Sequence, residues 1–251
     1  MSIELLEQSA RALEPVLSDV VFLGGASVVL WITDPAAPAP RPTKDVDVVV
    51  EVTSRTAFHA FEERLRSLGF TEDQEDGIIC RWRYRENDLI LDAMPPDAAI
   101  LGFENRWQGA SIPHAVECTL PSGATIRAAS PAYLLVTKIE AFNGRGHEDF
   151  LGSRDFGDMI ALIDGREELR GEVQDSKPEL RASTGSWTQG FPLSRAECMV
   201  MAGRVAFRSA GIRSDPYQHG SAEGMASLKQ ACGTGLEPKP AVRRPGPSRR
   251  A

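Results

Sequence analysis

Two aspartates interrupt a run of valines in the segment Asp45-Val-Asp-Val-Val-Val50. A short run rich in β-branched residues predicts a strand, here over 45–52, and residues two apart on a strand point to the same face. Asp45 and Asp47 are therefore expected to project together from one face of this strand. Unpaired carboxylates within a buried strand are energetically costly, so something must neutralise them. For the pair taken alone, a strand end that faces solvent is the alternative.

The segment 1–182 alternates between helical and strand patterns, which predicts an α/β fold (α+β). Predicted helices cover 3–17, which Pro15 is expected to end or kink, then 26–32, 55–68, 131–143 and 154–163, the last with Ser153 as its N-cap. A polar helical stretch follows and ends at about residue 181. Predicted strands cover 20–23, 45–52, 78–84 and 88–93. The turn residues Pro121-Ser-Gly123 predict that 116–120 and 125–128 form a hairpin. The segment 33–43 contains four prolines and is predicted to be a loop.

Charge divides the chain into two parts. Residues 183–251 contain ten Lys and Arg against four Asp and Glu, whereas residues 1–182 contain 18 against 31, which gives net charges of +6 and −13. Gly, Pro and Ser make up 23 of the 69 residues of the second part. We therefore expect a folded domain over 1–182 and a mostly disordered tail over 183–251, with one short helix over 196–207.

The sequence predicts a cytoplasmic protein without a membrane partner. No apolar run approaches the roughly 20 residues that a membrane span needs. Glu4 and Glu7 stand where a signal peptide carries basic residues. The four cysteines show no Cys-x-x-Cys spacing and no metal-ligand spacing, which favours buried or incidental thiols in a reducing compartment.

A third aspartate lies in another apolar segment, Leu89-Ile-Leu-Asp-Ala93. If this strand neighbours the first, Asp92 converges with Asp45 and Asp47. Mg²⁺ prefers one or two carboxylates together with water and phosphate oxygens, and two such ions support phosphoryl or nucleotidyl transfer. The three aspartates therefore predict a divalent-cation site.

A glycine turn precedes these strands in the sequence. Gly24-Gly25 follows the predicted strand 20–23 and comes before a predicted helix. Glycines let the backbone approach a phosphate closely, and Ser27 offers a hydroxyl contact. The turn fits neither a P-loop nor the dinucleotide fingerprint, and a turn without a ligand is the alternative.

A second cluster of charged residues lies near the end of the predicted domain. Lys138 interrupts the apolar side of its helix, and Arg145 lies seven residues further along the same face if the helix continues through 143–144. Asp155 and Asp158 are three residues apart and share a helical face. Both cations are suited to a triphosphate, and a salt-bridged surface is the alternative.

Taken in order, these residues resemble the nucleotidyltransferase superfamily with the DNA-polymerase-β-like minimal fold, and within it the AbiEii/AbiGii toxin group. The pattern consists of the glycine turn, the Asp-x-Asp strand, a later strand Asp, a helical Lys and a helix with Asp. The segment 130–142, Ser-Pro-Ala-Tyr-Leu-Leu-Val-Thr-Lys-Ile-Glu-Ala-Phe, is particularly similar to that group. The resemblance covers about residues 18–165. The spacer between Gly25 and Asp45 is longer than usual, and the usual C-terminal helical region is not recognisable after about residue 181.

The resemblance implies a small mixed β-sheet flanked by helices, an NTP substrate and Mg²⁺ or Mn²⁺ as the metal. The implied metal ligands are Asp45, Asp47 and Asp92, and Asp92 is also the candidate that activates the acceptor hydroxyl. The implied catalytic residues are Asp45, Asp47, Asp92, Lys138 and Asp155. The implied nucleotide-binding residues are Gly24, Gly25, Ser27, Lys44, Lys138, Arg145 and Asp158. Either Asp155 or Asp158 matches the last Asp of the pattern, with Asp155 slightly favoured.

The implied activity moves a nucleoside monophosphate from an NTP to a hydroxyl acceptor. The resemblance favours tRNA or another RNA as the acceptor, with a cognate antitoxin as a partner. An acidic domain is a poor surface for a polyanion, unless the basic tail or Arg81, Arg83 and Arg85 supply the contact. These arginines alternate along one strand face, and a solvated face is their alternative. The alternative functions are a small-molecule nucleotidyltransferase of the antibiotic-modifying type and a non-catalytic binding module.

Overall fold

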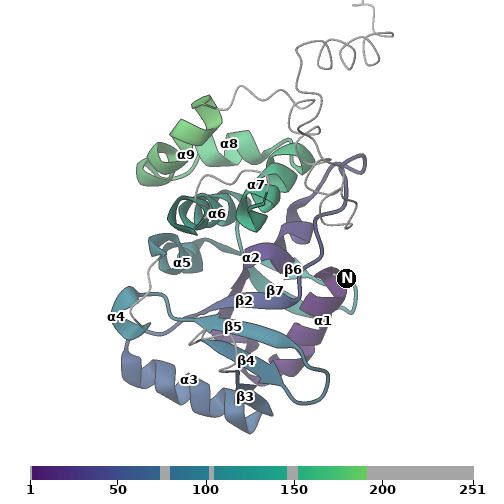
Figure 1. Cartoon of the computed structure of the whole chain (residues 1–251), viewed down its shortest axis with the longest axis vertical. Helices are drawn as coiled ribbons and strands as arrows, with labels where there is room; N and C mark the ends of the chain where they lie inside the picture. The colour runs from purple at the N-terminus through teal and green to yellow at the C-terminus, as the bar shows by residue number, and fades with distance from the viewer. Residues whose placement is uncertain (1, 74–79, 102–104, 146–151, 191–251) are drawn as a thin grey trace, which may run out of the picture. The chain divides into compact units, whose positions relative to one another are not determined.

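The valine-rich segment forms strand β2, Asp45–Val50, at the centre of the sheet. The computed structural model describes residues 2–73, 80–101, 105–145 and 152–190, all within the compact unit Met1–Ala210. In this described part, seven strands form one mixed sheet in the order β3-β4-β5-β2-β1-β7-β6 (Figure 1). The expected α/β fold, a mixed sheet flanked by helices, is confirmed.

The remaining strands are β1 (Val20–Leu23), β3 (Phe70–Glu72), β4 (Arg81–Tyr84), β5 (Ile90–Met94), β6 (Ala115–Thr119) and β7 (Thr125–Ala129). β2 pairs parallel with β5 and antiparallel with β1, and β1 pairs parallel with β7. β1 is buried along its whole length, as a continuous apolar run in the middle of a covered sheet requires. The predicted β6–β7 hairpin is confirmed. Strand β3 has no counterpart among the predicted strands, and the first residues of the predicted strand 78–84 lie outside the described part.

The helices are α1 (Ser2–Ala12), α2 (Gly24–Ser27), α3 (Arg55–Ser67), α4 (Ala98–Leu101), α5 (Arg106–Ser111), α6 (Pro131–Arg145), α7 (Arg154–Gly165), α8 (Leu169–Gln174) and α9 (Pro178–Gly190), with short 3₁₀ helices η1 (Glu14–Asp19), η2 (Val28–Trp31) and η3 (Ile112–His114). The predicted helix over 3–17 is interrupted near Pro15, as expected: α1 ends at Ala12, and Pro15, which cannot donate a backbone hydrogen bond, stands in the first turn of η1. The predicted helix over 26–32 is likewise replaced by the short helices α2 and η2.

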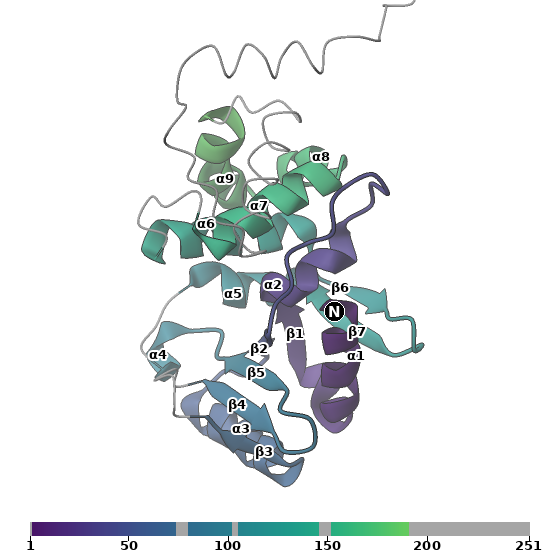
Figure 2. The same ribbon diagram turned by 45° about the vertical axis from the view of Figure 1, so that its right-hand side comes forward.

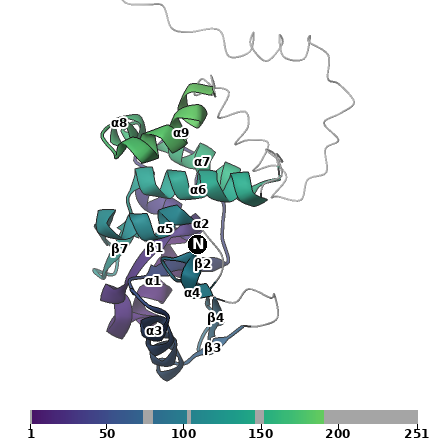
Figure 3. The same ribbon diagram turned by 90° about the vertical axis from the view of Figure 1, so that its left-hand side faces the viewer.

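Helix α6 lies at the centre of a helical group at one end of the sheet. It packs against α5, α7, α8 and α9 and also contacts α2, which follows directly from β1 (Figures 1 and 3). Residues 131–139 of α6 are all buried, which is the pattern of a helix covered on every side. Any charged side chain on this stretch of α6 therefore needs a partner inside the protein.

Helix α9 extends further than the sequence indicates. The polar helical stretch is expected to end at about residue 181, whereas α9 continues to Gly190. The side chains of Leu180 and Thr184 are completely buried, so packing stabilises a helix that its polar composition does not reveal. The helix continues past residue 182, where we expect the domain to end. Most of the tail, with its predicted helix over 196–207, lies outside the described residues.

None of the helices in the described part has both the length and the apolar character needed to cross a membrane. Two of the four cysteines are described, and both have free thiols. Burial and the neighbouring charges of Asp92 and Asp47 raise the pKa of the Cys80 thiol to about 12. Cys80 is therefore a buried, protonated thiol, and Cys118 is half-buried on β6.

Candidate active site

The three aspartates of the predicted cation site stand on neighbouring strands of the sheet. Asp47 on β2 and Asp92 on β5 are directly opposite each other in the parallel register. Asp45 and Asp47 are half-buried, while Val46 between them is completely buried. Side chains directly opposite each other in a sheet share a face, so β2 and β5 bring all three carboxylates to the same face.

The glycine turn lies directly against Asp47. Gly24 follows β1 and has a φ of +75°, in the left-handed region that favours glycine. A Cβ atom at Gly24 would lie 1.8 Å from Oδ2 of Asp47. Leu23, the preceding residue, is in register with Asp47 across β1 and β2. The turn and the Asp-x-Asp strand therefore meet at a point where only a glycine fits.

We expect Gly24→Ala to lower the free energy of unfolding by more than about 2 kcal/mol, because the alanine is strained at this φ and collides with Asp47. Urea unfolding followed by circular dichroism measures this loss. Gly25→Ala is the comparison: its Cβ meets Nη2 of Arg41 at 2.9 Å and Oδ2 of Asp158 at 3.3 Å, so only side-chain ends need to shift, and its φ is not in the left-handed region. The loss of unfolding free energy in Gly25→Ala should stay below about 1 kcal/mol. Equal losses for the two variants would contradict the assigned fit of Gly24 to Asp47.

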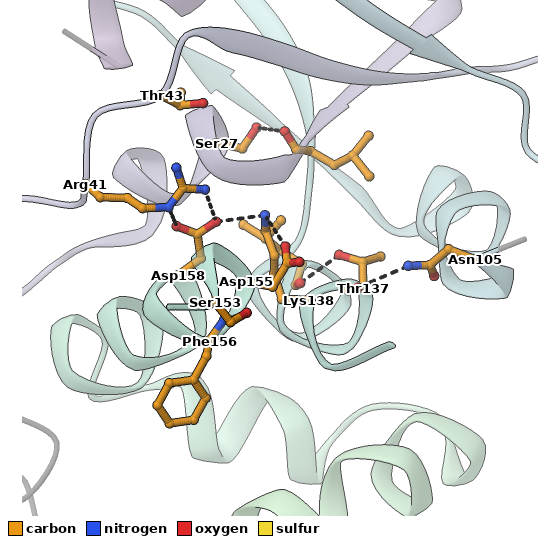
Figure 4. Close-up of polar contacts among 12 residues, drawn as sticks. Ser27, Arg41, Thr43, Asn105, Thr137, Lys138, Ser153, Asp155, Phe156 and Asp158 are labelled. Atoms are coloured by element: carbon orange, nitrogen blue, oxygen red, sulfur yellow. Dashed lines mark hydrogen bonds and ion pairs between the residues drawn. The ribbon is translucent and has the colours of Figure 1, made fainter. Parts of the chain in front are cut away.

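Asp158 on α7 is contacted by cations from two separate elements (Figure 4). Nζ of Lys138 on α6 lies 2.8 Å from Oδ2 of Asp158 and 3.3 Å from Oδ1 of Asp155. Nη2 of Arg41 donates a hydrogen bond to Oδ2 of Asp158 at 3.0 Å. Nε of Arg41 lies 2.9 Å from Oδ1 of Asp158, an ion-pair contact without hydrogen-bond alignment. Lys138, Arg41, Asp155 and Asp158 thus form one ion-pair network.

This network is buried, which differs from the salt-bridged surface considered as the alternative for these residues. The side chain of Asp158 is 1% exposed and that of Lys138 is 8% exposed. Burial alone lowers the pKa of the Lys138 ammonium, but the charges of Asp158, Asp155 and Asp47 raise it, and the net direction is upward. The surrounding carboxylates therefore favour the charged form of Lys138, and Asp47 contributes to this effect.

Helix α7 presents both aspartates because of its local sequence. Ser153 is the N-cap, and its side chain accepts a hydrogen bond from the backbone N–H of Phe156, which fixes the first turn of the helix. Asp155 and Asp158 follow on one face, as their spacing predicts, and both reach Lys138. Asp158 is the more central of the two, because it alone also contacts Arg41 in the described network.

The proline-rich loop between η2 and β2 brings Arg41 to the network. Figure 2 shows this loop, residues 33–43, running past α2 to the start of β2. The backbone N–H groups of Thr33 and Asp34 both donate to the carbonyl of Gly165 at the end of α7. Nη2 of Arg41 lies within 2.9 Å of a Cβ built on Gly25. The loop therefore places a guanidinium directly against the glycine turn.

Arg81 does not lie on an exposed strand face, where it could contact RNA. It is only 9% exposed, and its Nε and Nη2 donate to the two oxygens of Asp92, both at 2.8 Å. Nη2 also lies 3.2 Å from Oδ2 of Asp45. Arg83 pairs with Asp73. The strand register explains the position of Arg81. It stands directly opposite Asp92 across β4 and β5, so its guanidinium lies beside the carboxylates.

The other predicted nucleotide-binding residues have separate positions. Ser27 is completely buried and donates its hydroxyl proton to the carbonyl of Leu23, which leaves no proton for a phosphate oxygen in this conformation. Lys44 is exposed immediately before β2. Helix α6 does continue through residues 143–144, as the expected position of Arg145 requires, and Arg145 is its last residue; the side chain of Arg145 lies outside the described part.

Two of the three aspartates present a donor set that suits Mg²⁺. Within the described residues, no group of three or more His, Cys, Asp or Glu is arranged to hold a metal ion. Mg²⁺ needs only one or two carboxylates when phosphates and water complete its shell. Asp45 and Asp47, two half-buried carboxylates on one strand face, fit that requirement. Asp92 directs both oxygens at Arg81 instead.

Two residues of the site are missing from the sequence-based set. Arg41 is the first, and the signal that points to it is a cation shortly before the Asp-x-Asp strand in an otherwise apolar and proline-rich loop. Thr43 is the second: its hydroxyl donates to Oδ1 of Asp45 at 2.7 Å and so orients that carboxylate. Nothing in the local sequence distinguishes Thr43 from a solvent-exposed loop threonine.

Paired carboxylates on a central strand, a glycine turn against them, a buried lysine and a half-buried arginine form a candidate site for the transfer of a phosphorus-containing group. The model of the family described as "Nucleotidyl transferase AbiEii toxin, Type IV TA system" matches residues 5–190. The chain therefore belongs to this family of nucleotidyltransferase toxins. The match includes α9, which lies beyond the part of the sequence in which the resemblance is recognisable.

Solved structures show a weaker similarity. An antigenic nucleotidyltransferase-like protein from Paracoccidioides brasiliensis is 18% identical with a TM-score of 0.47, covering 82% of this chain and 92% of that one. The antibiotic-resistance factor ANT(2'')-Ia in solution is 13% identical with a TM-score of 0.40, covering 91% and 95%. The crystal structure of ANT(2'')-Ia with adenylyl-2''-tobramycin is also 13% identical, with a TM-score of 0.36, and the match covers 84% of this chain and 98% of that one. No curated protein matches the chain.

Proposed function

We propose that this chain transfers a nucleoside monophosphate from an NTP to a hydroxyl acceptor. The proposed acceptor is tRNA or another RNA, and the proposed protein partner is a cognate antitoxin. Membership of the family supports the reaction class. The observation that supports the site most directly is the contact between Asp47 and the Gly24 turn, with the Lys138–Asp158–Arg41 network beside it. This combination places carboxylates and cations next to the same turn.

Asp45 and Asp47 are the proposed ligands of Mg²⁺ or Mn²⁺, with Asp92 as the third carboxylate. A bound divalent cation neutralises the phosphates and favours the developing charge of the displacement. The hydroxyl of Thr43 holds Asp45 in place, and the close fit of Gly24 holds Asp47. The protein thereby orients both carboxylates before any ligand arrives, which reduces the ordering cost of binding.

The triphosphate of the NTP is proposed to lie at the Gly24-Gly25 turn. The guanidinium of Arg41 occupies the space beside Gly25, where its Nη2 lies 2.9 Å from the position of a Cβ atom, so it is the first cation that a phosphate at this turn meets. A guanidinium offers two parallel donors to a phosphate, while an ammonium acts as a point charge. We therefore assign Arg41 as a phosphate ligand and Lys138 as the buried charge that positions Asp158. Lys44 and Arg145 remain candidates for further phosphate contacts.

A specific observation supports a second candidate acceptor, a small molecule. Residues 1–182 have a net charge of −13, and Arg81 is engaged with Asp92 and Asp45. Both features reduce the attraction of the described surface for a polyanion. An RNA acceptor therefore depends on the basic residues of 183–251, whereas a cationic small molecule does not.

The experiment that tests the function uses the full chain, Mg²⁺ and each α-³²P-labelled NTP, with total RNA or a panel of aminoglycosides as acceptors. We expect label in RNA that is released by ribonuclease, with a preference for one of the four NTPs. Asp47→Asn serves as the inactive control. Label on an aminoglycoside alone would establish the second candidate. Failure to label either acceptor, with wild type and Asp47→Asn identical, would leave a binding module.

A further inference from the structure

Arg81 contacts two of the three aspartates, Asp92 and Asp45. Its Nε and Nη2 each donate to a separate oxygen of Asp92 at 2.8 Å, the paired geometry that gives arginine–carboxylate contacts their strength. Nη2 also lies 3.2 Å from Oδ2 of Asp45. The side chains of Arg81 and Asp92 are each only 10% exposed, so water screens this pair poorly. One guanidinium thus joins two of the three proposed metal ligands.

The sheet itself positions this guanidinium. Arg81 is in register with Asp92 across β4 and β5, and Asp92 is in register with Asp47 across β5 and β2. The three residues form one row over three hydrogen-bonded strands. The backbone of Arg81 is therefore fixed, and only rotation about its side-chain bonds can move the guanidinium away from Asp92.

A divalent cation and this guanidinium need the same oxygens. A metal bound to Asp92 must take at least one of the two oxygens that accept hydrogen bonds from Arg81. Two positive groups on one carboxylate also repel each other, most strongly where burial limits screening. Arg81 also weakens metal binding at Asp45, because its Nη2 lies close to Oδ2 of that carboxylate. The divalent cation and the guanidinium therefore compete for the oxygens of Asp92.

We propose that Arg81 is an internal counter-cation that competes with the divalent metal for Asp92 and so sets the metal affinity of the site. This inference rests on the proposed function, which places the metal at Asp45, Asp47 and Asp92. A divalent cation binds Asp92 only when Arg81 gives up at least one of its two hydrogen bonds to that carboxylate. The phosphates of a bound NTP bring negative charge that accommodates both cations. The protein therefore binds metal weakly alone and more tightly together with its nucleotide.

The test measures free Mn²⁺ by electron paramagnetic resonance during titration of the full chain without nucleotide. Arg81→Gln should bind Mn²⁺ about tenfold more tightly than wild type, because one positive charge leaves the ligand cluster. Arg81→Lys should lie between the two, since an ammonium keeps the charge but loses the paired contact. When a non-hydrolysable NTP analogue is added, the Mn²⁺ affinities of Arg81→Gln and wild type should become more similar.

Arg83→Gln is the matched control. Arg83 is the next residue on the same side of β4 and pairs with Asp73, away from the three aspartates, so its loss should leave Mn²⁺ affinity unchanged. A thermal-unfolding series gives a second readout. Arg81→Gln should unfold at a lower temperature than wild type in EDTA and recover more stability than wild type when Mn²⁺ is added.

The outcomes separate this inference from the proposed function. Equal Mn²⁺ affinity in wild type, Arg81→Gln and Arg81→Lys, with a clear loss in Asp47→Asn, would overturn the role of Arg81 and leave the function intact. An absence of Mn²⁺ binding in wild type and both Arg81 variants, with and without the analogue, would overturn both. If Arg81→Gln does not fold in EDTA, the affinity of Arg81→Lys decides the question.

Discussion

Replacement of Asp47 by Asn should lower the rate of nucleotidyl transfer by at least about a thousandfold, because the amide keeps the shape of the carboxylate and removes the charge that a divalent cation requires. Asp47 is the aspartate in contact with the glycine turn, and its charge acts on Lys138. The initial rate of label transfer from a ³²P-labelled NTP measures the effect. Substrate binding through Arg41 should largely survive.

The control for this prediction is Asp175→Asn, an exposed aspartate at the end of α8, which should leave the rate unchanged. Circular dichroism should show that Asp47→Asn retains the helical signal of wild type. A folded Asp47→Asn protein with a rate within tenfold of wild type would refute the proposed metal role of Asp47.

Replacement of Asp158 by Asn should lower the free energy of unfolding by about 3–5 kcal/mol, the usual cost of removing one partner from a buried ion pair. Asp158 is 1% exposed and serves two cations, Lys138 and Arg41. Without its charge, Lys138 keeps only the longer contact to Asp155, at 3.3 Å, within the described network. Urea unfolding of the full chain measures the loss.

Asp155→Asn provides the comparison, because it leaves the 2.8 Å contact between Lys138 and Asp158 in place. It should cost clearly less than Asp158→Asn. A double-mutant cycle with Lys138→Met isolates the interaction between Lys138 and Asp158. If the two single Asn variants lose the same small amount, below about 1 kcal/mol, the network does not stabilise the fold as the contacts indicate.

Several parts of the structure follow from local sequence patterns. The alternation in Asp45–Val50 predicts which residues of β2 share a face, and the burial of its valines agrees. The turn of the β6–β7 hairpin is predicted from Pro121-Ser-Gly123, and Gly123 has a φ of +88°. Ser153 caps α7 as its residue type predicts. These features depend on residues a few positions apart, so a single segment contains all the information.

The elements whose bounds or existence differ from the sequence-based prediction, α9 and β3, have a common cause. The polar composition of α9 indicates an end near residue 181, but Leu180 and Thr184 are buried and the helix continues. The short strand β3 exists because it pairs with β4, and its three residues have no distinctive pattern of their own. In both cases tertiary contacts outweigh a weak local preference.

Local patterns predict most of the helices and strands and the residue types of the candidate site: a glycine turn, paired aspartates on one strand face, and a lysine and two aspartates on later helices. Which of these charges meet depends on the packing of the whole domain. Arg41 reaches Asp158 across a separation of 117 residues, and Arg81 is directed to Asp92 by the register of β4 and β5. Spacing along one segment determines which residues share a face, but ion pairs between distant segments depend on how the sheet and the helices pack.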